Sequence, residues 1–259
     1  MSDDPRASVK SADRVLDMFE LLARWGDGMS HTALAEALDI PKSSLSQLLK
    51  TLTSRGYISF DAGSKTYRLG GRFADLARQT AQLHDLIGLA ERILAEVTES
   101  TNESSAFNLL RGDMTEVMAT VSSPQRLVSH MRLGDLAPLY ATSGGKVILA
   151  FLPEAMREEY LGRVVFEPVT PHTLTSSADL KRQLETVRRE GVAYSFEEFT
   201  LGIIGMAMPV LSESGHPLAS INIAMPAVRY NSRVRERIIE TLGNATAKLA
   251  AHIQRSGRL

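Results

Sequence analysis

One segment near the N-terminus constrains the fold of this chain more than any other. A Ser-capped apolar helix is expected over Ser30–Leu38, and a second helix begins near Pro41, since proline suits the first helical turn. Two short runs at 55–60 and 65–69 are rich in strand-forming residues and flank a four-residue turn, which predicts a β-hairpin. Two closely spaced helices followed by a hairpin predict a winged helix-turn-helix.

The second of these helices has two distinct faces. Leucines recur at i, i+3, i+4 and i+7 on one face: Leu45, Leu48, Leu49 and Leu52. The other face is short, polar and uncharged or positive, as a helix that enters a DNA major groove requires. We expect base contacts from Ser43, Ser44, Ser46 and Gln47. We expect phosphate contacts from Lys42, Lys50, Lys65 and Arg68.

Charge supports this interpretation locally and not globally. The whole chain carries a net charge of −1, so its overall balance does not indicate nucleic acid. Residues 41–72 nevertheless hold six basic residues and a single acid, Asp61. Charge alone is explained better by an ordinary solvated surface. Together with the two helices and the hairpin, it favours double-stranded DNA as a partner.

Length and composition limit the remaining possibilities. A chain of 259 residues is long for one domain, and two are expected. It has no cysteine, which excludes disulfides and thiolate chemistry. Residues 1–7 lack the apolar run of a signal peptide, and no apolar stretch approaches the length of a membrane span. These features predict a cytoplasmic protein without a membrane partner.

The pattern predicts two domains of mixed α/β (α+β) class, at residues 9–78 and 79–259. A first helix is expected at Ser11–Trp25, and a broken helix over Arg72–Glu99 acts as the linker. Strands are expected at 105–111, 116–122, 127–132, 205–212 and 217–224. Helices are expected at 143–152, 176–190 and 232–253. In the helix at 176–190, Ser176 has the character of an N-cap and Gly191 that of a C-cap.

The chain resembles the IclR family of bacterial transcriptional regulators over nearly its whole length. The N-terminal matches are residues 9–16, the run from Leu34 through Pro41-Lys42-Ser43-Ser44 to Arg55-Gly56-Tyr57, and Tyr67-Arg68-Leu69-Gly70. The C-terminal matches are Leu133-Gly134, Pro138-Leu139, Ala141–Lys146, Glu197-Glu198, Gly202 and Ala207–Val210. The winged helix alone is shared by many regulators, whereas the combination in this order is specific.

The resemblance implies a winged helix joined by a linker helix to a GAF-like α/β domain that binds a small effector. It also implies homodimers or homotetramers on palindromic operators, repressing or activating catabolic operons in response to small carboxylic, aromatic or sugar acids. The positions that align with family effector contacts are Ser129, Ala141, Ser143, Gly144, Gly145, Ser195, Ile203, Gly205, Asn222 and Ala224. For each one singly, an ordinary half-buried strand residue is the alternative.

This chain departs from the family pattern at three positions. Gln47 stands where many members have Arg, and Gln reads adenine better than guanine. Ser195 and Gly205 stand where some members have an acid and a Cys, which weakens transfer of those members' ligands.

The apolar stripes of residues 12–22 and 72–83 are the candidate dimer contact, with a solvent-bridging linker as the alternative.

Two glycines near the start of the helix at 143–152 allow backbone N–H groups to face an anionic ligand. The alternative is a tight turn that packs the helix on the sheet. The loop at 196–202 is expected to close over the ligand with Gly202 as a hinge, while Glu197 and Glu198 serve loop structure.

An enzyme or a metabolite-binding module is the competing class of function. Ser143 and Lys146 match the S-x-x-K motif of serine β-lactamases, but its companion motifs are absent. The six histidines are scattered without metal-ligand spacing: His31, His84, His130, His172, His216 and His252. We therefore expect no catalytic residue, no metal and no cofactor.

Overall fold

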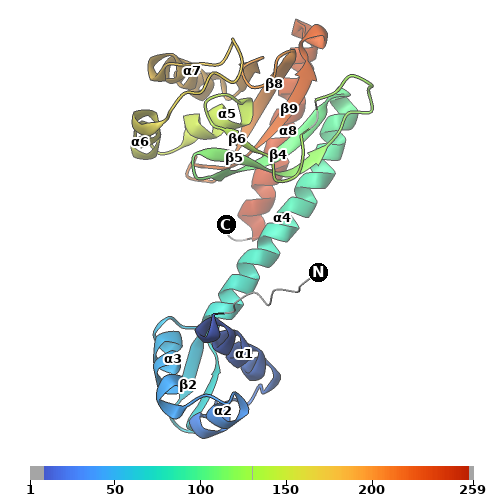
Figure 1. Ribbon diagram of the computed structural model, residues 1–259. Helices are drawn as coiled ribbons and strands as arrows, with labels where there is room; N and C mark the ends of the chain where they lie inside the picture. Colours follow the sequence, from blue (N-terminus) through green and yellow to red (C-terminus); the bar gives the residue numbers. More distant parts are fainter. Residues whose placement is uncertain (1–8, 130, 257–259) are drawn as a thin grey trace, which may run out of the picture. The chain divides into compact units, whose positions relative to one another are not determined.

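The computed structural model describes residues 9–129 and 131–256. The chain divides into two compact units, residues 1–82 and 83–259 (Figure 1). The predicted domain boundary, between residues 78 and 79, and this division both fall within helix α4 (Gly71–Thr101).

The N-terminal unit holds three helices and a small antiparallel sheet of strand order β1-β3-β2. Its helices are α1 (Lys10–Arg24), α2 (His31–Ala37) and α3 (Lys42–Ser54). Its strands are β1 (Met29–Ser30), β2 (Ile58–Asp61) and β3 (Thr66–Leu69). The predicted pair of helices and hairpin wing are confirmed, and the short strand β1 is an addition that the sequence pattern did not indicate.

Local signals explain these boundaries. The Ser30 side chain accepts a hydrogen bond from the Ala33 N–H and so caps α2. Pro41 is the N-cap residue of α3, so it lies one position before the first helical turn in which the sequence pattern placed it. Leu45, Leu49 and Leu52 of α3 are buried with residues of α1, α2 and β2, as the leucine spacing predicts.

Helix α4 (Gly71–Thr101) is continuous for 31 residues, so the predicted break is wrong. No proline interrupts this segment, and a side chain at its one interior glycine, Gly88, would meet no neighbour within 4 Å. From Leu86 onward α4 packs into the core of the C-terminal unit.

The C-terminal unit is built on a six-stranded antiparallel sheet of order β6-β5-β4-β9-β8-β7. Its strands are β4 (Ser104–Arg111), β5 (Met114–Val121), β6 (Leu136–Pro138), β7 (Ala193–Phe196), β8 (Ile203–Leu211) and β9 (Pro217–Pro226). Its further helices are α5 (Ser143–Phe151), α6 (Glu154–Arg163), α7 (Ser177–Glu190), the 3₁₀ turn η1 (Ala227–Arg229) and α8 (Ser232–Ser256). The sequence pattern did not indicate α6 or β7.

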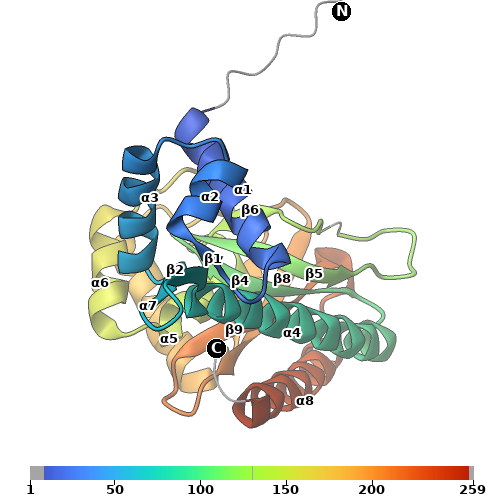
Figure 2. The ribbon, with the colours of Figure 1, turned by 90° about the horizontal axis from the view of Figure 1, so that it is seen from below.

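Helices cover both faces of this sheet. Helices α4 and α8 lie side by side on one face (Figures 1 and 2), where their apolar stripes form one core with β4, β8 and β9. Helices α5, α6 and α7 form a second core on the other face. The Ser176 side chain caps α7, and Gly191 ends that helix at φ +74°, as predicted.

The predicted strand at residues 127–132 is wrong. Its described residues, 127–129 and 131–132, form a loop, while His130 lies outside the described residues. A turn through Gly134 at φ +82° returns the chain to β5, where the Gly134 N–H donates to the Val117 carbonyl and β6 begins at Leu136. Ser129 therefore stands on a loop rather than on a sheet strand.

Candidate DNA interface and effector cavity

The polar face of α3 is open to solvent. Ser43 and Gln47 are exposed, and their side chains have no hydrogen-bond partner among the described residues. Ser44 is half-buried. The Ser46 hydroxyl donates to the Lys42 carbonyl and is 2.9 Å from His31 Nε2, so it is already engaged. Gln47 and Ser43 are therefore the side chains of α3 most available to a base edge.

The predicted phosphate contacts lie on α3 and on the wing. Lys42 and Lys50 are exposed on α3, and Lys65 stands in the wing turn at φ +52°. Arg68 folds back instead, because its Nε donates to the Asp27 carbonyl at 3.0 Å. In the wing turn, N–H groups of Gly63 and Ser64 donate to the Asp61 carboxylate and hold its pKa below the ordinary value.

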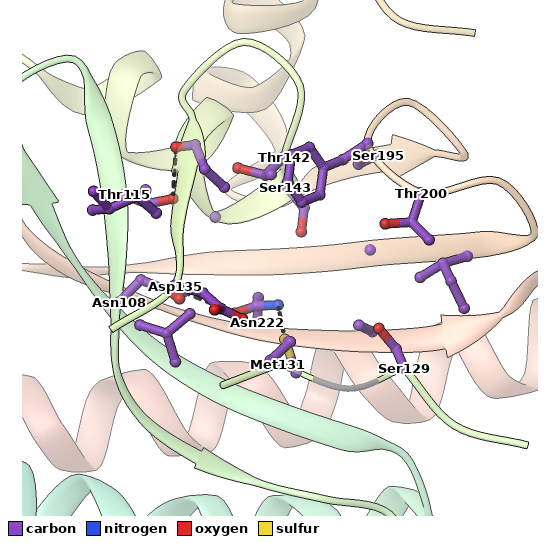
Figure 3. Close-up of a pocket in the computed structure, with 18 residues that line it drawn as sticks. Asn108, Thr115, Ser129, Met131, Asp135, Thr142, Ser143, Ser195, Thr200 and Asn222 are labelled. Atoms are coloured by element: carbon purple, nitrogen blue, oxygen red, sulfur yellow. Dashed lines mark hydrogen bonds between the residues drawn. The ribbon is translucent and has the colours of Figure 1, made fainter. Parts of the chain in front are cut away.

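A cavity of about 330 Å³ lies in the C-terminal unit between the sheet, the start of α5 and the loops after β5 and β7 (Figure 3). It is lined by eight of the ten positions expected to contact an effector: Ser129, Ser143, Gly144, Ser195, Ile203, Gly205, Asn222 and Ala224. Ser195 lies on strand β7, and Ile203 and Gly205 lie on β8, so Ser195 and Ile203 are strand residues and not, as expected from the sequence, part of the loop between them.

Two asparagines form the polar floor of this cavity. The Asn108 amide donates to Asn222 Oδ1 at 2.8 Å and to Ser220 Oγ at 3.2 Å. Among the described residues, Asn222 Nδ2 donates only to the Met131 sulfur at 3.4 Å, a weak acceptor. The Ser143 hydroxyl and Thr200 face this floor across the cavity (Figure 3). Asn222 and Ser143 therefore hold hydrogen-bonding capacity that a ligand can use.

The start of α5 presents backbone donors to the cavity. The Thr142 side chain caps the helix by accepting the Gly145 N–H at 3.1 Å. The N–H groups of Ser143 and Gly144 have no partner among the described residues. Free N–H groups at a helix N-terminus favour a negatively charged group.

Two of the ten expected effector contacts do not line the cavity. A Cβ atom at Gly145 would stand 2.5 Å from Leu139 Cα, so this glycine allows α5 to pack on the backbone of residue 139. The tight-turn alternative is thus the better explanation for Gly145. Ala141 is fully buried, and its carbonyl accepts the Ser195 hydroxyl at 2.8 Å. Ala141 therefore positions Ser195 rather than touching the cavity.

The residues that line the cavity beyond the expected effector contacts include Asn108, Thr115, Met131 and Asp135. A signal for Asn108 exists, since it is a polar residue inside the apolar run of β4. Asp135 is the one charged side chain among the described residues that line the cavity. Its carboxylate accepts the Arg132 N–H at 2.8 Å.

Lys146 faces away from the cavity. Its ammonium group, fully buried, donates to both Glu198 oxygens at 2.6 and 2.7 Å, to Gln183 Oε1 and to the Tyr194 carbonyl. Burial lowers the pKa of Lys146 and raises that of Glu198, while their mutual attraction opposes both shifts. Lys146 is thereby unavailable as a base for Ser143, so the S-x-x-K match does not describe a nucleophile here.

The same ion pair anchors the loop that borders the cavity. Thr170 and Thr173 donate to the carbonyls of Glu197 and Glu198, and the Glu197 carboxylate accepts the Gly202 N–H. The assignment of both glutamates to loop structure agrees with these contacts. Since both ends of the loop are held, closure about Gly202 as a single hinge is not the expected motion.

The two units together define a class: a winged-helix DNA-binding protein with a small-molecule-binding α/β domain. Comparison with family models places the chain more narrowly. The helix-turn-helix domain of IclR matches residues 11–62, and the C-terminal domain of the bacterial transcriptional regulator IclR matches residues 78–251. The chain belongs to the IclR family of bacterial transcriptional regulators.

Individual relatives agree with this assignment. The transcriptional regulator KdgR of Dickeya chrysanthemi is 28% identical over 93% of this chain and 79% of its own length. The crystal structure of a regulator from Rhodococcus sp. RHA1 superposes with a TM-score of 0.66 at 26% identity, covering 96% of this chain and all of the other. A mutant inducer-binding domain of PobR from Acinetobacter, in complex with 3-hydroxybenzoic acid, superposes with a TM-score of 0.58 at 26% identity. The match covers 63% of this chain and 96% of the PobR chain.

The part of the chain that the structure describes lacks two further features. None of its helices is both long and apolar enough to cross a bilayer. No group of three or more His, Asp or Glu residues within residues 9–129 and 131–256 is arranged to hold a metal ion.

Proposed function

We propose that this protein controls a catabolic operon in the bacterial cytoplasm by binding the operator DNA as a homodimer or homotetramer. A small organic acid in the cavity either releases the protein from the operator or makes it bind. The observation that supports this most directly is the pairing of an open polar face on α3 with a cavity that ends at free helix N–H groups.

For the DNA contacts, Gln47 is proposed to read a base edge and Lys50 to contact a phosphate. Gln47→Ala should relax sequence preference at one position per half-site, at a cost of about 1–3 kcal/mol. Lys50→Ala should weaken binding to all sequences alike. Binding of a random pool of duplexes, followed by sequencing, checks both outcomes. If both variants select the same sites with wild-type affinity, the recognition face is assigned wrongly.

For the effector, we propose that its carboxylate binds the N–H groups of Ser143 and Gly144 together with the Ser143 hydroxyl, and that its remaining polar group meets Asn222. The described lining supplies no Lys or Arg, so these neutral donors would carry anion recognition. The complex of the PobR domain with 3-hydroxybenzoic acid supports an aromatic or hydroxylated acid as the first ligand to test.

Calorimetry with a panel of small organic acids tests this assignment on wild type, Ser143→Ala and Asn222→Ala. Both variants should bind the preferred acid at least about tenfold more weakly, because each loses a hydrogen bond to a charged or polar ligand group. Ser100→Ala is the matched control, since Ser100 is exposed on α4. Undiminished binding by both variants, or a preference for cationic ligands, would remove this cavity from consideration.

The oligomeric state has its own test. Leu16 and Leu76 are large apolar side chains that stay 58% and 38% exposed on α1 and α4, which supports a contact with a second copy there. Leu16→Glu and Leu76→Glu should lower the sedimentation coefficient at micromolar concentration. A monomeric wild type would contradict the proposed dimer.

A further inference from the structure

A groove of about 440 Å³ lies in the N-terminal unit between α3 and the wing. Helix α3 forms one wall with Ser46, Leu49, Lys50, Thr53 and Ser54. The wing forms the other wall with Phe60 and Tyr67. The groove therefore continues directly from the recognition face of α3, with which it shares Ser46 and Lys50.

The wing wall is aromatic, and its Phe60 ring lies outside the hydrophobic core of the unit. Phe60 and Tyr67 are direct partners in the β2–β3 register, with ring centroids 4.8 Å apart. Phe60 remains 47% exposed, and the core of this unit is instead built from residues such as Ile58. An exposed phenylalanine that the core does not use is available to a partner.

The helix wall is positive and carries no competing acid. Lys50 is the one charged side chain among the described groove residues. The nearest acid in sequence, Asp61, directs its carboxylate to the N–H groups of Gly63 and Ser64 in the wing turn. The groove thus offers a cation on one wall and an apolar ring on the other.

We propose that this groove seats one strand of the DNA sugar–phosphate backbone, with a phosphate at Lys50 and a deoxyribose against the Phe60 ring. A helix in the major groove and a hairpin beside it require the bordering strand to cross between them. The inference rests on the proposed binding mode of α3. It adds Phe60 and Tyr67 to the DNA contacts and moves Ser46 from the base edges to the backbone.

The charge of each wall makes the test specific. Phe60→Ala should weaken binding about fivefold, equally for selected and mixed-sequence duplexes, because part of an apolar contact is lost. The dependence of log K on log salt should keep its wild-type slope, since no cation is removed. Lys50→Ala should reduce that slope by about one unit. Phe60→Leu, which preserves an apolar side chain, should retain most of the affinity.

Trp25→Ala is the matched control, since Trp25 is a 59% exposed aromatic side chain of the same unit that does not line the groove. This variant should bind as wild type does. Because Trp25 is the only tryptophan, the double variant Trp25→Phe/Phe60→Trp places a single fluorophore in the groove. Its emission should change when a mixed-sequence duplex is added.

Wild-type affinity of Phe60→Ala, with an unchanged circular dichroism spectrum, would overturn the inference and leave DNA binding by α3 standing. Loss of affinity together with loss of the oligomer in sedimentation would overturn it in favour of a contact between copies. Failure of the wild type to bind any duplex would instead refute the proposed function itself.

Discussion

Replacing Lys146 by methionine should destabilise the C-terminal unit by about 3–5 kcal/mol, the range observed when one partner of a buried ion pair is removed. The Lys146 side chain is 0% exposed and that of Glu198 is 6% exposed. Methionine fills most of the same space, so the packing around α5 changes little. The loss comes from the Glu198 carboxylate and the Tyr194 carbonyl, which remain buried without their donor.

Urea and thermal denaturation followed by far-UV circular dichroism measure this effect. A loss of 3–5 kcal/mol corresponds to a fall in Tm of about 6–20 °C for a unit of this size. The single tryptophan, Trp25, lies in the N-terminal unit, so its fluorescence should report a transition that the substitution leaves in place.

Lys248→Met is the matched control, because the Lys248–Glu96 pair has the same 2.6 Å separation but side chains 59% and 61% exposed. Its loss should cost less than about 1 kcal/mol. The double variant Lys146→Met/Glu198→Leu should recover much of the stability, since an apolar pair leaves no unpaired charge. Equal effects of the two lysine substitutions, or no recovery in the double variant, would refute the reasoning.

Further predictions concern two glycines and a carboxylate. Gly145→Ala should lower the free energy of unfolding by about 1–3 kcal/mol, because its Cβ would meet the Leu139 backbone at 2.5 Å. Gly88→Ala in α4 should instead raise it by about 0.5–1 kcal/mol, because no neighbour lies within 4 Å of the added Cβ. A destabilised Gly88→Ala variant would contradict the helix geometry. The pKa of Asp61 is lowered from 3.8 by wing N–H groups, so the wing keeps this contribution above pH 3.8 and loses it as the pH falls through the lower folded pKa. A carboxyl titration by NMR with a midpoint at or above 3.8 would show that the turn does not hold Asp61.

The sequence by itself determined the winged helix-turn-helix, because its signals are local. The Ser30 cap, the leucine spacing of α3 and the two strand-forming runs each act within a few residues. The same holds for α7, whose ends are set by Ser176 and Gly191. Family resemblance indicated Asn222, Ser143 and Ser195 as cavity residues, because members of one family share the order of strands and helices that places these positions.

Only the tertiary structure decided which of these residues face the cavity and which serve packing. Gly144 and Gly145 are adjacent in the chain, yet the first lines the cavity and the second lies against Leu139, since successive helical residues point in different directions. The sequence pairs Lys146 with Ser143 in an S-x-x-K match, whereas the fold pairs it with Glu198, 52 residues away. Such contacts depend on where strands and loops meet in space, and the periodicity of the sequence does not predict contacts between residues so far apart in the chain.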